Sequence, residues 1–111
     1  MQVKDLCRIA YTESRRNGWY DEERNLGEMI ALLHSEASEM LEALRKPDPE
    51  TGEPKDSEKI PGFNELEEEA ADLAIRLADF CEHTGCRLED AISAKLAYNR
   101  TRGHRHGGKS F

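Results

Sequence analysis

Apolar side chains recur at steps of three and four residues along most of the chain, which is the spacing of helices that bury one face. No stretch alternates apolar and polar residues as a half-buried strand does, and β-branched residues are sparse. The pattern predicts an all-α fold. It is clearest in the second predicted helix, with apolar positions at Leu26, Ile30, Leu33, Ala37, Met40, Leu41 and Leu44.

Residues with strong preferences for helix ends divide the chain into four predicted helices. Asn17-Gly18 is a typical stop after the first helix, and Pro47 requires the second to end near Arg45. Asn64, followed by Glu67 three residues later, predicts a capping box at the start of the third helix, and Gly85 closes it. The predicted helices cover residues 2–16, 26–45, 64–84 and 88–99.

The segment from residue 46 to residue 62 separates the second helix from the third. It contains all four prolines of the chain, two glycines and almost no apolar residue, so we expect a long loop. Loops of this length are usually lids over a site or mobile linkers.

A chain of 111 residues with four narrow apolar stripes predicts a single domain, 1–111, built as an antiparallel four-helix bundle. The apolar stripes are too narrow to make more than a modest core. Self-association, as a homodimer or homotetramer, is therefore expected to complete the bundle.

Charge is unevenly distributed along this acidic chain, whose formal net charge is −7. Residues 95–111 contain five Lys and Arg and no Asp or Glu, so that segment carries +5 and the first 94 residues carry −12. The end of this positively charged segment, residues 100–111, is called the basic tail below. An acidic body disfavours binding to duplex nucleic acid, whose phosphates need a cationic surface.

Membrane insertion and secretion are not expected. The longest apolar run, residues 29–33, is far shorter than a bilayer span, and the N-terminus lacks the apolar stretch of a signal sequence. Three cysteines are an odd number with no disulfide-framework spacing, which fits a reducing compartment. We expect a cytoplasmic protein.

Two pairs of acids occupy equivalent positions beside the apolar stripes of the second and third helices. Glu36 and Glu39 are three residues apart, as are Glu69 and Asp72, and both pairs lie on the same rotational side of their stripe. If the two helices pack antiparallel, all four carboxylates lie level along one groove. They would repel one another unless a cation compensates. Oxygen-only ligands suit Mg²⁺, or Mn²⁺, better than Zn²⁺.

These carboxylate pairs, E-x-x-E at 36–39 and E-x-x-D at 69–72, resemble the metal motif of the all-α NTP pyrophosphohydrolases, the MazG-like family. The sequence KLAYNRTR at 95–102, followed by HGGK at 106–109, is similar to the ending of small members of that family. The resemblance covers roughly residues 19–109. It implies Mg²⁺-dependent hydrolysis of a nucleoside triphosphate between the α and β phosphates, to the monophosphate and pyrophosphate, in a helical oligomer.

Carried over to this chain, the family pattern implies that the metal ligands are Glu36, Glu39, Glu69 and Asp72. Either Glu36 or Glu39 is also the candidate general base. Basic and polar residues near the C-terminus would face the phosphates: Lys95, Asn99, Arg102 and Lys109. Trp19 is a candidate to stack on a base or, equally, a hydrophobic plug at the corner between the first two helices. Asn17 and His34 are candidates for sugar or base contacts. Two features depart from the family: Ser35 precedes Glu36 where a second glutamate is usual, and the 46–62 loop is long.

Other interpretations compete with the hydrolase. A zinc site would use Cys81, His83, Cys86, His104 and His106, although Cys81 borders an apolar stripe and fits a buried thiol better. A di-iron site requires Glu-x-x-His, which does not occur. Phosphoribosyl-ATP pyrophosphohydrolase is a rival of the same fold. From another class, the chain could be a non-enzymatic helical interaction module that uses an acidic groove and a basic tail.

Overall fold

The chain is all-helical in the computed structural model, which describes residues 1–111 with every side chain except that of residue 106. The described residues form no strand beyond an isolated antiparallel bridge between Asp56 and Asn64. This confirms the predicted all-α class. The helices are α1 (Val3–Arg16), α2 (Leu26–Arg45), α3 (Glu65–Thr84), α4 (Leu88–Arg100) and a single turn, α5 (Arg105–Gly108).

The helix ends lie where the capping residues predicted them. Asn17 caps α1, and Gly18 follows with a φ of 86°, a left-handed conformation that favours glycine. At the start of α3, the Asn64 side chain accepts from the Glu67 N–H at 2.8 Å, and the Asn64 N–H donates to the Glu67 carboxylate at 3.1 Å. Gly85 ends α3 with a φ of 75°.

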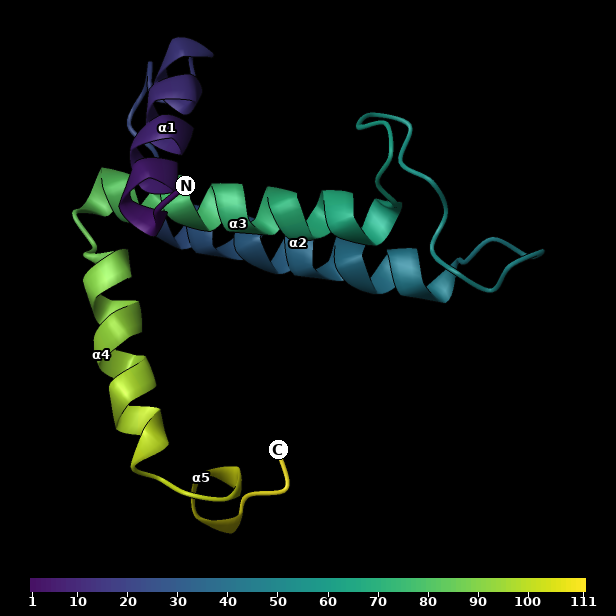
Figure 1. The fold of residues 1–111 in the computed structure, drawn as a ribbon. Coiled ribbons are helices and arrows are strands. Elements are labelled where there is room, and N and C mark those ends of the chain that lie inside the picture. The colour runs from purple at the N-terminus through teal and green to yellow at the C-terminus, as the bar shows by residue number, and fades with distance from the viewer.

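Helices α2 and α3 run side by side in opposite directions, and α1 packs across the C-terminal half of α3 (Figure 1). The core between α1 and α3 is made by Cys7, Ala10, Ala78 and Cys81, each no more than 5% exposed. These are small side chains, so the two helix backbones approach closely. The predicted burial of Cys81 is confirmed.

Helix α4 projects away from the other three helices (Figure 1). It makes a few contacts with α1, none of its residues is fully buried, and Leu96 is 52% exposed. One chain therefore holds a packed unit of three helices with a fourth extended from it, rather than a closed four-helix bundle. Completion of the bundle by other copies stays a prediction.

Helix α2 buries a different face from the one predicted. Met29 and Ala43 are buried against α3, whereas Leu26, Ile30, Leu41 and Leu44 are between 40% and 56% exposed. On a helical wheel with about 100° per residue, Met29 lies beside the predicted apolar stripe rather than at its centre. Apolar residues cover more than one side of α2, so periodicity alone did not identify the side that meets α3.

The predicted 46–62 loop forms no helix and, apart from the bridge at Asp56, no β structure, as expected. Among the described residues, no helix is long and apolar enough to cross a membrane.

Candidate metal centre

Three carboxylates from two helices converge where α2 and α3 pack together. Glu36 comes from α2, and Glu69 and Asp72 come from adjacent turns of α3. One carboxylate oxygen of each lies within 4.8 Å of the other two, and all three residues are half-buried. Among the described side chains, this is the one group of three or more Asp, Glu, His or Cys residues close enough to share a cation.

Glu39, the fourth expected ligand, is exposed and outside this group. Residues three apart on a helix differ in direction by about 60°. Glu36 lies seven residues after Met29, so both point towards α3, and Glu39 is turned away from that line. Partial burial is the main cause of the raised pKa of Glu69, and the charge of Glu39, one turn of α2 beyond Glu36, also contributes to it.

The cluster carries more negative charge than its neighbours neutralise. The Arg76 side chain binds Glu36, with 2.6 Å between Nε and Oε1. Partial burial and repulsion from Asp72 nevertheless raise the pKa of Glu69 above its ordinary value. Partial burial and repulsion from Glu36 likewise raise the pKa of Asp72, although the positive charges of Lys59 and Arg76 oppose that rise.

Glu68, which the sequence interpretation did not single out, also belongs to this region. It precedes Asp72 by one turn of α3, and its side chain is only 12% exposed. Its carboxylate accepts from the Ser57 hydroxyl at 2.5 Å and lies 3.8 Å from the Lys59 ammonium. These partners come from the 46–62 loop, whose path the helical pattern does not predict.

The chemistry of the donor set fits a hard divalent cation. Carboxylate oxygens are the ligands that Mg²⁺ and Mn²⁺ prefer, and Mg²⁺ keeps part of its water shell while it is held by one or two carboxylates and a phosphate. Neighbouring carboxylates raise the pKa values of Glu69 and Asp72 in addition to partial burial, so an added cation would relieve a repulsion that is already present.

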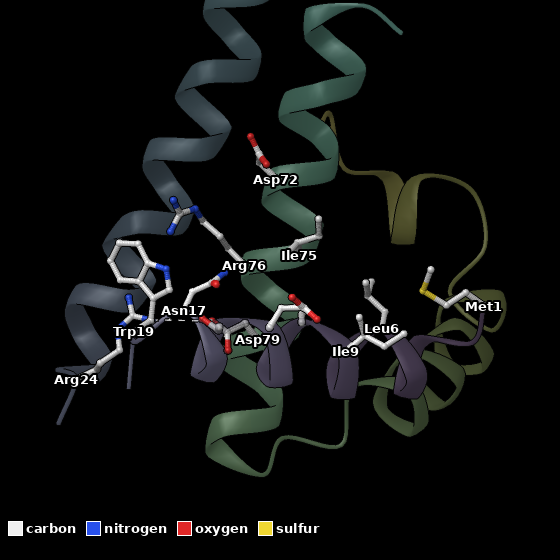
Figure 2. A pocket seen from close by; sticks show the side chains of 13 residues that line it. Met1, Leu6, Ile9, Asn17, Trp19, Arg24, Asp72, Ile75, Arg76 and Asp79 are labelled. Carbon is white, nitrogen blue, oxygen red and sulfur yellow. Dashed lines mark hydrogen bonds and ion pairs between the residues drawn. The ribbon is translucent and has the colours of Figure 1, made fainter. Parts of the chain in front are cut away.

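A pocket of about 490 Å³ opens between α1 and α3 and reaches the cluster at Asp72 and Arg76. Figure 2 shows Asp72, Arg76 and Asp79 in succession along α3, with Trp19 and Asn17 beside the lower part of that row. Trp19 is 59% exposed, which excludes its role as a buried plug. The Arg24 guanidinium lies 5.7 Å from the centre of its ring.

Asp79, which the sequence interpretation did not single out, is the buried acid of this pocket. It is 8% exposed and accepts hydrogen bonds from Ser14 at 2.9 Å and Tyr20 at 2.8 Å. Burial and the bond to Asp79 raise the pKa of the Tyr20 phenol. The signal was available in the helical spacing, since Asp79 follows Asp72 by seven residues and therefore lies on the same face of α3.

The residues expected to face the phosphates lie apart from the cluster within one chain. Lys95 and Asn99 are on α4, and Arg102 and Lys109 follow it, on the arm that projects away from α2 and α3 (Figure 1). Lys95 and Arg102 approach the face of the Tyr98 ring, at 4.6 and 5.6 Å from its centre. His34 is exposed on α2.

The zinc interpretation gains no support from the described side chains. Cys81 is buried in the core, and His83 stacks on Tyr20 with their ring centres 4.5 Å apart. The side chain of His106 lies outside the described part of the structure.

Comparison of the chain with protein-family models, with curated proteins and with solved structures gave no match.

Proposed function

We propose that this protein is a Mg²⁺-dependent nucleoside triphosphate pyrophosphohydrolase of the MazG-like kind, with Mn²⁺ as a possible substitute metal. The observation that carries the proposal is the convergence of Glu36, Glu69 and Asp72 from two helices. Carboxylate oxygens that repel one another are suited to bind a hard divalent cation such as Mg²⁺, which also binds phosphates. The resemblance of both carboxylate motifs and of the C-terminal sequence points to the same reaction.

In this proposal, Glu36, Glu69 and Asp72 hold the metal. When bound, Mg²⁺ supplies positive charge that offsets the charge developing on the leaving pyrophosphate. Glu39 takes the proton from the attacking water, because it lies at the edge of the cluster and its carboxylate is exposed, whereas Glu36 is already bound to Arg76. Attack at the α phosphorus then yields the monophosphate and pyrophosphate.

The pocket beside the cluster is the proposed site for the nucleoside. Its volume of about 490 Å³ lies within the range of small-ligand sites. Trp19 offers an exposed aromatic face for a base to stack on, and Asn17 offers an amide at the same rim.

Assembly as a homodimer or homotetramer is part of the proposal. The cluster lacks the predicted phosphate contacts from its own α4, and the same arm from a second copy carries Lys95, Asn99, Arg102 and Lys109. The acidic body and basic tail of two copies are complementary in charge. Exposed apolar side chains on α2 and α4, such as Leu41 and Leu96, provide surface for the contact.

The direct test is release of pyrophosphate from the ribo- and deoxyribonucleoside triphosphates, with Mg²⁺ and with a chelator. We expect Mg²⁺-dependent release from at least one nucleotide, and its loss in Glu69→Ala and Asp72→Ala proteins that keep their helical circular dichroism. Glu50→Gln, an exposed acid at the tip of the loop, is the matched control and should leave the rate unchanged.

A second candidate is the non-enzymatic interaction module, favoured by an α4 with no fully buried residue and an exposed Ile92 and Leu96. No release of pyrophosphate from any nucleotide would favour the module over the hydrolase.

A further inference from the structure

The end of the loop is fastened to the first turns of α3, close to the cluster. The Glu65 N–H donates to the Lys55 carbonyl and the Ser57 N–H donates to the Phe63 carbonyl, both at 2.8 Å. Together with the bridge between Asp56 and Asn64, these bonds close residues 55–64 into a compact turn, which we call the clamp turn. Backbone hydrogen bonds therefore hold the clamp turn in a defined position against the start of α3.

Ser57 is the centre of the clamp turn. Its hydroxyl donates to Glu68 at 2.5 Å and accepts from the backbone N–H groups of Lys59 and Ile60 at 3.1 Å each. Glu68 lies on the turn of α3 that leads to Asp72, so these bonds hold the backbone of Lys59 beside the carboxylate cluster.

Lys59 is a positively charged side chain close to the carboxylate cluster. Its Nζ lies 3.8 Å from the carboxylate of Glu68, which is one turn of α3 from Asp72, and its own side chain is 79% exposed. Arg76, in contrast, is bound tightly to Glu36. A lysine ammonium on a flexible, exposed stem can turn from one anion to another at little cost.

We propose that Lys59 is a phosphate-binding residue, which contacts the β or γ phosphate of the triphosphate at the carboxylate cluster, and that Ser57 and Glu68 position it. This inference rests on the proposed function. It assigns part of the phosphate recognition to the 46–62 loop of the same chain, in addition to the basic residues on α4.

The test compares Lys59→Met with Lys55→Met, an exposed lysine in the same turn. With Mg²⁺ present, Lys59→Met should raise KM by about tenfold to a hundredfold, the usual value of a hydrogen bond between charged groups. Lys55→Met should stay within twofold of wild type, and Lys59→Arg should recover part of the loss. Ser57→Ala should raise KM by a smaller factor, because Lys59 is present but less well held.

A binding measurement separates phosphate recognition from a merely structural role. With Mg²⁺ present, added pyrophosphate should raise the melting temperature of wild type and of Lys55→Met but not of Lys59→Met. The rise given by Mg²⁺ alone should be at least as large in Lys59→Met as in the other two proteins, because that variant keeps every proposed metal ligand and loses only a positive charge near them. Without ligands, the melting temperature of Lys59→Met should fall only slightly, because an exposed ion pair contributes little to stability.

The outcomes distinguish the two proposals. An active wild type whose KM and pyrophosphate response are unchanged by Lys59→Met overturns the role of Lys59 and leaves the hydrolase intact. A wild type that hydrolyses no nucleotide overturns the hydrolase, and the role of Lys59 with it.

Discussion

The direction of single side chains decides which acids form the cluster. Glu36 and Glu39 look equivalent in the sequence, but the rotation of α2 points Glu36 at α3 and leaves Glu39 exposed. Two acids of one motif thus have different surroundings, which is how carboxylates of the same type acquire different chemical roles.

Substituting these two glutamates should therefore have separable effects. We expect Glu36→Gln to lose both hydrolysis and the rise in melting temperature given by Mg²⁺, because it removes a metal ligand. Glu39→Gln should keep that rise while its kcat falls by about a hundredfold or more, the usual contribution of a general base. Calorimetric melts with and without Mg²⁺, run beside the pyrophosphate assay, check both. Loss of the Mg²⁺ response in Glu39→Gln would instead make Glu39 a ligand.

The raised pKa values of Glu69 and Asp72 predict how stability depends on pH. A carboxyl group whose pKa is higher in the folded state than in the unfolded state binds protons more tightly when folded. Stability is therefore lost as the pH rises from the unfolded to the folded pKa. We expect Asp72→Asn to melt a few degrees higher than the metal-free wild type at pH 7, with the difference shrinking towards about pH 4.

Mg²⁺ should have the opposite pH profile, because it binds ionised carboxylates. Its stabilisation of wild type should be large at pH 7, small near pH 4, and absent from Asp72→Asn at both. A metal concentration of 100 times Kd corresponds to about 2.7 kcal/mol. Equal Mg²⁺ responses in wild type and Asp72→Asn at pH 7 would contradict a metal site at this cluster.

At the scale of the helices, local chemistry was sufficient to predict the end of α1 and both ends of α3, although it did not predict the single turn α5. Asn64 with Glu67, Asn17 with Gly18, and Gly85 act through neighbouring backbone groups, so their signals need no knowledge of the fold.

The faces of the helices were harder to predict than their ends. Apolar residues lie on more than one side of α2, and the side that is buried depends on which of them meets α3. The surroundings of Glu68 depend on the 46–62 loop, which packs back against α3. Both are contacts between distant segments, which periodicity within one helix does not specify. The sequence consequently predicted Glu36, Glu69 and Asp72 together, but not the separation of Glu39 or the part played by Lys59, Arg76 and Asp79.

The cap of α3 gives a prediction at this scale. Asn64→Ala removes the side chain that accepts from the Glu67 N–H and should lower the free energy of unfolding by about 1 kcal/mol, or roughly 4–8 °C in melting temperature for a domain of this size. The backbone N–H of residue 64 remains in this variant and can still donate to the Glu67 carboxylate. Asn25→Ala is the matched comparison, since Asn25 makes the same kind of cap bond by accepting from the Glu28 N–H at 2.9 Å. Thermal melts of both proteins should show losses of similar size. An unchanged melting temperature in Asn64→Ala would mean that the cap bond contributes nothing.

At the scale of the whole molecule, the three packed helices hold the acids and the projecting arm holds most of the predicted phosphate contacts. If one copy supplies the acids and another the arm, two inactive variants should restore activity when mixed. Asp72→Asn and Lys95→Ala, unfolded and refolded together, should regain about a quarter of wild-type activity if the assembly is a dimer, because half of the dimers are hybrids with one intact site. No recovery would indicate that each site draws both residues from the same chain.

Helix α4 buries no residue fully in its own chain, and thirteen residues are near the lower limit for a helix that is stable alone in water. If contacts with neighbouring copies stabilise α4, dilution would dissociate the copies, and α4 would then unfold before the three packed helices do. Under the proposed hydrolase function, specific activity would then rise with protein concentration, so the abundance of the protein would itself set the rate of nucleotide breakdown, without any separate inhibitor.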